Sequence, residues 1–380
     1  MAETSQLSLM LMRMRFSRFF LFVVAWCTPA KLYAQPTVWR LAPSPTVRVG
    51  AAEGPVLSLA APPGATRLPN GNIAVGDLAE YAIREFTPSG AVVKRYAHKG
   101  QGPGQVGFLA PLLRCGSVLV ANDITGPISV FQLDGTFQRA SRFHTPTYRL
   151  ACNASLQFAV MGWAQDRDTK VGAYRPSVRF WIARPDTSAE VSLGIIPGGD
   201  RWRVASGDGP LPLGREPRVV ISQSRAYIAL GDRVEVLVFD LNGKTLPSLS
   251  APSARVRVTK ADVDAERERQ IAQLGERARA MIERSYGDMT MPTLLPATRD
   301  LLVDALGDVW VQHHPSATSA TVRWTVFSPD GKVRATIGLP VALQVYEIGA
   351  DYVLGRYVDP DAQVPEVWLY RLSERLASGR

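Results

Sequence analysis

Short apolar segments that end in a small or polar residue recur along this chain of 380 residues. Each is rich in β-branched and aliphatic residues, a pattern typical of a strand that is buried on both faces. The segments lie at residues 73–77, 119–123, 159–163, 228–232, 310–314 and 353–357. The pattern therefore predicts six equivalent strands, one in each of six repeated units.

A second element follows four of these segments. It consists of an aromatic residue at a strand end and a tight turn that closes on glycine, where a positive φ carries no Cβ penalty. The four turns lie at 86–90, 131–135, 239–243 and 327–331. Further strands flank these two elements, so one unit is a meander of four strands. A four-stranded meander that repeats about every 45 residues is typical of a propeller blade.

Six such units fit the chain, so we predict an all-β fold, a six-bladed β-propeller, with seven blades as the alternative. Two longer steps between units indicate insertions, one at 164–176 together with 198–217 and one at 253–296. The sixth unit has only three strands before the chain ends. The segment 37–50, with Val38-Trp39 and Val47–Val49, is predicted to supply its fourth strand, because a closed ring leaves no exposed sheet edge.

Residues 1–34 are predicted to be a secretory signal peptide, followed by a single propeller domain at 35–380. Arginines precede an apolar core from Phe19 to Trp26, and Ala34 places a small residue at the cleavage site. This core is shorter than the roughly 20 residues that span a bilayer, so we expect no transmembrane segment after cleavage. An uncleaved anchor is the alternative. We expect an exported protein, periplasmic or extracellular.

Composition and cysteine usage agree with an exported, folded chain. The hydrophobic fraction of 46% excludes intrinsic disorder, and 31 glycines with 28 prolines exclude a long coiled coil. The net charge of +9 is modest, and an exported protein does not meet the genome, so we expect no nucleic-acid binding. Cys115 and Cys152 follow the first strands of adjacent units. Equivalent positions on adjacent inner strands lie within reach of a disulfide, so we predict that these cysteines form one.

One stretch resembles a known group of propellers. Residues 67–105 read RLPNGNIAVGDLAEYAIREFTPSGAVVKRYAHKGQGPGQ. They resemble NHL-type six-bladed propellers, whose units pair a strand ending in Asp with an aromatic strand, a Gly turn and a Gly-rich loop. The mature chain also resembles exported bacterial six-bladed β-propeller proteins of unassigned activity. This resemblance implies architecture more than chemistry, because one fold hosts many functions.

Residues 258–286 are predicted to form a helical insertion before the fifth blade. Thr259, three residues before Asp262, is expected to cap the helix. Apolar residues at helical spacing form a stripe among arginines; they are Val263, Ile271, Leu274, Ala278, Met281 and Ile282. We expect the helix to pack across one face of the propeller, with a lid over the central opening or a docking surface as alternatives.

Candidate ligand contacts are chosen by position on the face that carries the loops between second and third strands and between units. They are Asp77, His98, Gln101, Asp123, His144, His313 and Arg356. The glycine-rich loop 100–105 lacks the Lys-Ser/Thr of a phosphate loop, and no G-x-S-x-G motif occurs. We therefore predict a binding module without a catalytic motif or cofactor. We expect it to be a monomer whose partner is an envelope protein or a small ligand.

A metal-dependent lyase or hydrolase is the alternative, of the NHL-like or gluconolactonase-like propeller type. His98, His144 and His313 are expected to open onto one face, where three imidazoles could bind zinc as in the lyase branch of NHL-like propellers. Asp77, Asp123 and Asp232 occupy equivalent positions where a strand turns and would ring one face. A shared cation is therefore conceivable there, and calcium is the other cofactor considered. A further possibility is an envelope scaffold that binds an anionic polymer through the Arg-rich helix.

Overall fold

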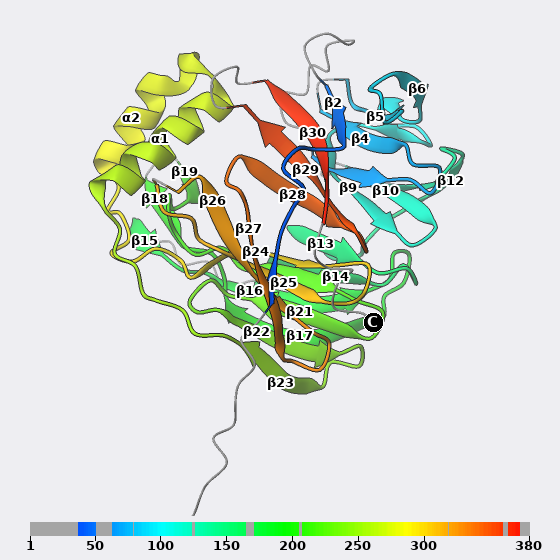
Figure 1. Cartoon of the computed structure of the whole chain (residues 1–380). Coiled ribbons are helices and arrows are strands. Elements are labelled where there is room, and N and C mark those ends of the chain that lie inside the picture. The colour runs from blue at the N-terminus through cyan, green and yellow to red at the C-terminus, as the bar shows by residue number, and fades with distance from the viewer. Residues whose placement is uncertain are drawn as a thin grey trace, which may run out of the picture. The chain divides into compact units, whose positions relative to one another are not determined.

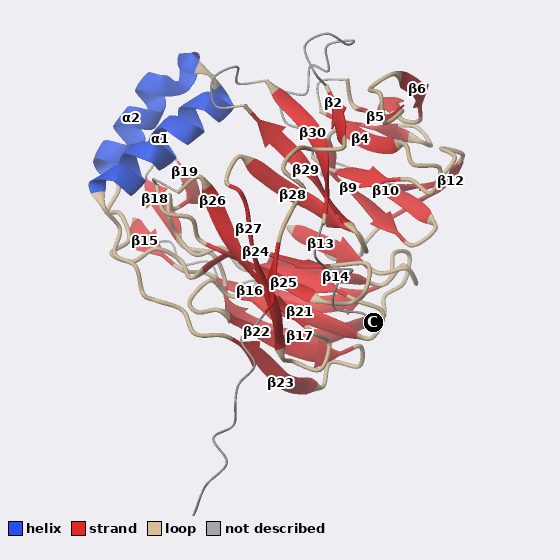
Figure 2. Cartoon of the chain, in the orientation of Figure 1, coloured by secondary structure: helices blue, strands red, loops and turns tan. Residues whose placement is uncertain are grey.

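In the computed structural model the chain divides into two units, Met1–Gln35 and Pro36–Arg380. The structure describes residues 37–50, 63–78, 80–123, 126–164, 171–204, 207–317, 319–359 and 364–372. The predicted signal peptide lies outside these described residues. Strands make up most of the regular structure of the second unit (Figure 2). Across the described ranges, no helix is long and apolar enough to cross a membrane.

Sheets of four antiparallel strands succeed one another along the second unit (Figure 1). The first contains β3 (Ala65–Arg67), β4 (Ile73–Asp77), β5 (Ala82–Phe86) and β6 (Val92–Arg95). The second contains β9 (Leu109–Cys115), β10 (Val118–Asp123), β11 (Ile128–Gln132) and β12 (Phe137–Ser141). The third contains β13 (Arg149–Cys152), β14 (Phe158–Trp163), β16 (Ser177–Ala183) and β17 (Glu190–Pro197).

The second half of the unit repeats this arrangement. The fourth sheet contains β20 (Arg218–Ile221), β21 (Arg225–Ala229), β22 (Glu235–Asp240) and β23 (Thr245–Ser250). The fifth contains β24 (Thr298–Val303), β25 (Val309–His313), β26 (Thr321–Phe327) and β27 (Val333–Pro340). The sixth contains β28 (Leu343–Ile348), β29 (Tyr352–Val358), β30 (Pro365–Arg371) and β2 (Val47–Val49).

These sheets form a closed cycle. The first strand of each sheet contacts the first strand of the next, and β28 of the sixth sheet contacts β3 of the first. Within the described part of the chain, six hydrophobic clusters lie between the six pairs of neighbouring sheets, including the pair formed by the sixth and the first. The predicted all-β propeller fold is therefore confirmed.

The sequence pattern within a sheet follows from its place in this cycle. Every residue of β4 (Ile73–Asp77) is buried, because strands flank it on both sides and sheets cover both of its faces. Every residue of β6 (Val92–Arg95), the outermost strand, is exposed. The glycines of the predicted turns adopt positive φ, with values of 88° at Gly90, 86° at Gly135 and 84° at Gly243. The turn prediction is confirmed at these positions.

The amino-terminal segment closes the cycle, but in two parts. Val47–Val49 (β2) pairs antiparallel with β30 as the outermost strand of the sixth sheet, with Val47 opposite Leu369, which confirms the prediction for these residues. The prediction is wrong for Val38-Trp39. They belong to β1 (Thr37–Trp39), which pairs parallel with β27 and extends the fifth sheet. The Trp39 ring explains this position, since it packs 5.6 Å from the Trp310 ring in the cluster between the fifth and sixth sheets.

The predicted helical insertion is a pair of helices, α1 (Lys260–Leu274) and α2 (Arg279–Asp288), joined by a short 3-10 turn at Glu276–Ala278. The Thr259 cap is confirmed, because Thr259 and Asp262 form a reciprocal capping box. A single helix to residue 286 is wrong, since Gly275 has a φ of +86° and ends α1. The predicted apolar stripe is partly wrong. Its members Leu274 and Met281 are exposed, whereas Ile271 and Ile282 are buried.

The other predicted insertion forms a small sheet of its own. β15 (Gly172–Tyr174), β18 (Arg201–Val204) and β19 (Gly207–Pro210) pair antiparallel, outside the meander of the third and fourth sheets. A parallel pair of two short strands, β7 (His98–Lys99) and β8 (Gln105–Val106), forms in the glycine-rich loop between the first and second sheets.

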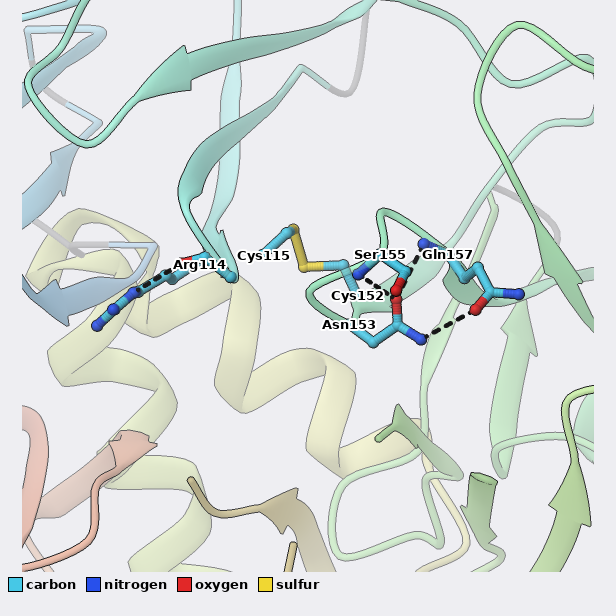
Figure 3. Close-up of a disulfide and its surroundings, with 7 residues drawn as sticks. Arg114, Cys115, Cys152, Asn153, Ser155 and Gln157 are labelled. Carbon is cyan, nitrogen blue, oxygen red and sulfur yellow. Dashed lines mark hydrogen bonds between the residues drawn. A yellow bond between two sulfur atoms is a disulfide. The ribbon is translucent and has the colours of Figure 1, made fainter. Parts of the chain in front are cut away.

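The predicted disulfide is confirmed. Cys115 ends β9 and Cys152 ends β13, their Cα atoms lie 5.6 Å apart, and the bond links the innermost strands of the second and third sheets. Figure 3 shows Asn153 directly after this bond, with its Oδ1 atom accepting backbone hydrogen bonds from Ser155 and Gln157 at 3.0 and 3.1 Å. The disulfide therefore joins two adjacent sheets beside an ordered turn.

Candidate functional site

A channel of about 710 Å³ runs between the innermost strands. Every sheet contributes to its wall, through residues that include Gly64, Leu112, Leu150, Val219, Leu301 and Val345. Where several innermost strands begin, a second cavity of about 570 Å³ shares Tyr148, Arg149 and Arg218 with the channel. Residues of α1 and α2 line its other side, so we call this cavity the hairpin pocket. Where the innermost strands end, a third cavity of about 700 Å³ lies beside Cys152.

Arginines are the most numerous charged side chains in the lining of the hairpin pocket. Among the described residues, its lining includes four arginines and two carboxylates, Glu216 and Glu266. The arginines are Arg149, Arg218, Arg269 and Arg299. Because guanidinium groups remain protonated in proteins, the pocket wall carries an excess of positive charge.

Three of these arginines have carboxylate partners. The Arg149 Nη2 atom lies 3.2 Å from Glu216 Oε1. The Arg218 Nε atom donates to Asp300 Oδ1 at 3.2 Å. The Arg269 Nε atom donates to Glu266 Oε2 at 2.8 Å. Burial alone would raise the pKa of Glu266, but hydrogen bonds from Arg269 and the nearby charge of Arg299 lower it.

Arg299 differs from the other three. Across the residues that the structure describes, its side chain makes no hydrogen bond and no ion pair, although it lines the pocket and is half-buried. Burial lowers its pKa, and the neighbouring charges of Arg269 and Arg218 lower it further. The carboxylates nearest to it, Glu266 and Asp300, are already bonded to Arg269 and Arg218. The pocket therefore presents a cation that lacks a counter-ion.

Other polar groups line the same pocket. The Tyr286 hydroxyl and the Arg149 Nε atom are buried without a hydrogen-bond partner among the described residues. His314 also lines the pocket, and its Nδ1 atom donates to the Pro315 carbonyl at 2.8 Å. Burial and the charge of Arg299 both lower the pKa of His314. An oxyanion in the pocket would meet unused donors as well as positive charge.

The two predicted aspartates hold their own sheets together. Asp77 is fully buried and forms an ion pair with Arg84 of the next strand. Asp123 borders the channel, where its carboxylate accepts hydrogen bonds from the backbone N–H groups of Gly107 and Phe108, at 2.5 and 3.2 Å. Of these two residues, only Asp123 lies at a cavity.

The predicted residues of the inter-sheet loops lie on the surface. His98 and Gln101 are exposed, and the His98 Nε2 atom lies 3.1 Å from the Gln105 amide nitrogen. His144 is exposed and follows β12. None of these residues is among those that line the three cavities. Their role as ligand contacts stays a prediction.

His313 and Arg356 lie within sheets. The His313 Nε2 atom is 2.8 Å from the Thr325 hydroxyl of the adjacent strand. The Arg356 Nε atom is buried and has no hydrogen-bond partner among described atoms. In the parts of the chain that the structure describes, no three His, Cys, Asp or Glu side chains are grouped so that they could hold a metal ion. His98, His144 and His313 are therefore not arranged as a ligand set.

The arginines of the hairpin pocket were not among the candidates taken from the sequence. Their shared feature is a position near the start of an innermost strand, and this feature is recognisable only once the strand bounds are known. Arg149 and Arg218 are the first residues of β13 and β20, and Arg299 is the second residue of β24. The innermost strands of the third, fourth and fifth sheets thus each carry an arginine within their first two residues, and all three arginines line the hairpin pocket.

Comparisons with known proteins show which solved structures this fold is similar to. No protein-family model and no curated protein matches the chain. A member of the DUF4221 family from Bacteroides vulgatus is 10% identical, with a TM-score of 0.52 over 89% of this chain and 99% of that one. The two proteins share a fold. At this identity the likeness extends to architecture alone, so the NHL-type resemblance stays a prediction from sequence.

Two further solved structures are less similar. A candidate exported protein from Bacteroides fragilis is 12% identical, with a TM-score of 0.48 over 88% of this chain and 96% of that one. A calcium-binding protein, regucalcin, from Agrobacterium tumefaciens is also 12% identical, with a TM-score of 0.41 over 88% of this chain and 96% of that one.

Proposed function

We propose that this chain is an exported binding protein that holds the oxyanion of a small ligand in the hairpin pocket. The unpaired guanidinium of Arg299 carries the proposal. A half-buried cation is costly unless an opposite charge compensates for its lost hydration. The carboxylates beside it are already bonded to other arginines, so an incoming anion would supply that compensation. A guanidinium donates two parallel hydrogen bonds to a carboxylate or phosphate.

Binding explains the pocket better than catalysis does. Nucleophilic catalysis needs a nucleophile hydrogen-bonded to a base. In the pocket, His314 Nδ1 donates to the Pro315 carbonyl and the Ser285 hydroxyl donates to the Met281 carbonyl at 2.9 Å. These two groups are engaged with backbone, and neither activates the other. The metal-dependent alternative gains no support from the grouping of side chains described above.

The test is calorimetric titration of the purified protein with citrate and with inorganic phosphate. We expect Arg299→Ala to weaken binding about tenfold or more, because a hydrogen bond to a charged group contributes about 1.5–3 kcal/mol. The matched control is Arg277→Ala. Arg277 is an exposed arginine in the turn between α1 and α2, and it does not line the pocket. Affinity should also fall as salt rises, because added ions screen the attraction.

Two results would contradict the proposal. One is the absence of measurable binding of either anion to the unaltered protein. The other is equal affinity in the Arg299→Ala and Arg277→Ala proteins, since this would place the bound anion elsewhere on the surface.

A further inference from the structure

Two exposed aromatic rings lie beside the hairpin pocket. Tyr148 precedes β13 and lines the pocket. Its ring centroid is 5.2 Å from that of Trp163, the last residue of β14, and the planes are inclined at 45°. The exposed fractions are 42% for Tyr148 and 36% for Trp163. Together they present an apolar aromatic surface to solvent, directly next to the cationic pocket.

Ion-paired arginines hold this aromatic pair in place. The Arg201 guanidinium lies 4.9 Å from the Trp163 centroid, and the Arg149 guanidinium lies 5.5 Å from the Tyr148 centroid. Arg201 pairs with Asp208 of the inserted sheet at 3.4 Å, and Arg149 pairs with Glu216 at 3.2 Å. Asp208 also pairs with Arg203 at 3.2 Å, so each ring is supported by an arginine that belongs to an ion-pair network, and the exposed part of each ring can contact a ligand.

The geometry of the pair limits what can stack on it. A spacing of 5.2 Å leaves no room for another ring between Tyr148 and Trp163, and Arg201 occupies part of one Trp163 face. A ligand therefore has to stack from one side, on the outer surface. The C–H face of a sugar ring suits a one-sided aromatic contact, and its hydroxyl groups stay in water. An apolar surface with a polar rim is also typical of ligand sites.

We propose that the ligand is an acidic saccharide, an inference that rests on the proposed anion-binding function. A carboxylate of the saccharide binds Arg299 inside the hairpin pocket, and a sugar ring of the same chain stacks on Tyr148 and Trp163. A chain of uronic-acid units supplies both groups in one molecule. Exposure of the aromatic pair at the pocket edge gives the remaining units a path to solvent.

The test compares a trimer of galacturonic acid with acetate, by calorimetric titration of the full chain. We expect the trimer to bind more tightly than acetate, and Trp163→Ala to weaken trimer binding about fivefold, as expected for one lost ring contact. Acetate binding should be unchanged in this variant, and Trp163→Phe should restore most of the trimer affinity. The control is Phe108→Ala, because the Phe108 side chain is 43% exposed and lies outside the hairpin pocket.

The outcomes separate the two proposals. If the trimer binds no more tightly than acetate, or if Trp163→Ala binds it as the unaltered protein does, the saccharide inference is overturned and the anion site stands. If the unaltered protein binds neither compound and neither citrate nor phosphate, the anion site itself is overturned.

Discussion

The consecutive histidines 313 and 314 show how strongly a residue's chemistry depends on its place in the fold. His313 ends β25 and bonds to the Thr325 hydroxyl, and burial together with the charge of Arg323 lowers its pKa to about 4. His314 lies one residue further on and borders the hairpin pocket instead. From the sequence, His313 is a candidate contact and His314 is not. Only the first is enclosed by its own sheet.

The lowered pKa of His313 predicts acid sensitivity. An unfolded histidine titrates near pH 6.5, so the native state binds fewer protons than the unfolded state between about pH 6.5 and 4. Stability is therefore present above pH 6.5 and is lost as the pH falls through this window. We expect the His313 contribution to be about 1–2 kcal/mol after allowance for solvent screening. His313→Gln should flatten the pH dependence of the free energy of unfolding, measured by urea denaturation.

A matched variant isolates this effect. His144 is exposed and follows β12, so His144→Gln removes a histidine outside the sheets and serves as the control. A curve for His313→Gln that remains as steep as that of the unaltered protein would assign the acid sensitivity to other groups.

At the scale of the element, the helical pair that covers the hairpin pocket depends on its first turn. Thr259 and Asp262 cap each other's backbone, and Asp262 also accepts a hydrogen bond from the Ala317 N–H at 3.1 Å. The carboxylate thereby fastens the start of α1 to the loop after β25. The cap was predictable because it involves residues three positions apart, whereas the Ala317 contact joins residues 55 positions apart.

Removal of the Thr259 cap should therefore destabilise the start of α1, one of the two helices that line the hairpin pocket. We expect Thr259→Ala to lower the free energy of unfolding by about 1 kcal/mol, the usual effect of a lost N-cap. Lys260→Ala is the control, because the Lys260 side chain is 88% exposed and its pair with Asp264 contributes little. Denaturant unfolding measures the free energy of unfolding of both variants. Equal values for Thr259→Ala and Lys260→Ala would show that the cap does not stabilise the protein.

At the scale of the whole molecule, the amino-terminal strand β2 completes the sixth sheet. Val49 is fully buried in the cluster between the sixth and first sheets. Arg48, the preceding residue, points the other way, with a side chain that is 53% exposed and pairs with Glu366. Successive side chains of a strand point to opposite faces. The Val49 side chain therefore packs between the sixth and first sheets, and the Arg48 side chain lies at the surface.

A charged side chain at position 49 should destabilise the contact between the sixth and first sheets. We expect Val49→Asp to lower the free energy of unfolding by about 3 kcal/mol or more, because it buries an unpaired carboxylate between two sheets. Arg48→Ala on the same strand should cost less than about 1 kcal/mol. Thermal unfolding of the two variants tests this. Similar melting temperatures for both would mean that β2 does not hold the sixth sheet to the first.

Features that depend on near neighbours followed from the sequence. The buried strand 73–77, the glycine turns and the Thr259 cap each depend on residues a few positions apart, and the disulfide followed once the repeat was recognised. The sequence misplaced Val38-Trp39, because the parallel pairing of β1 with β27 joins residues almost 300 positions apart. Likewise, nothing in the stripe pattern showed that Gly275 would break the helix.

The sequence by itself determined that the chain repeats a four-stranded unit, since hydrophobic periodicity and turn chemistry are local. Only the tertiary structure decided which charged side chains come together. Arg149, Arg218 and Arg299 are far apart in the chain and lie within the first two residues of three different strands. They meet because the innermost strands run side by side around one channel. Arg299 lacks a partner because the fold pairs the nearby carboxylates with other arginines, and such a competition for partners exists only in three dimensions.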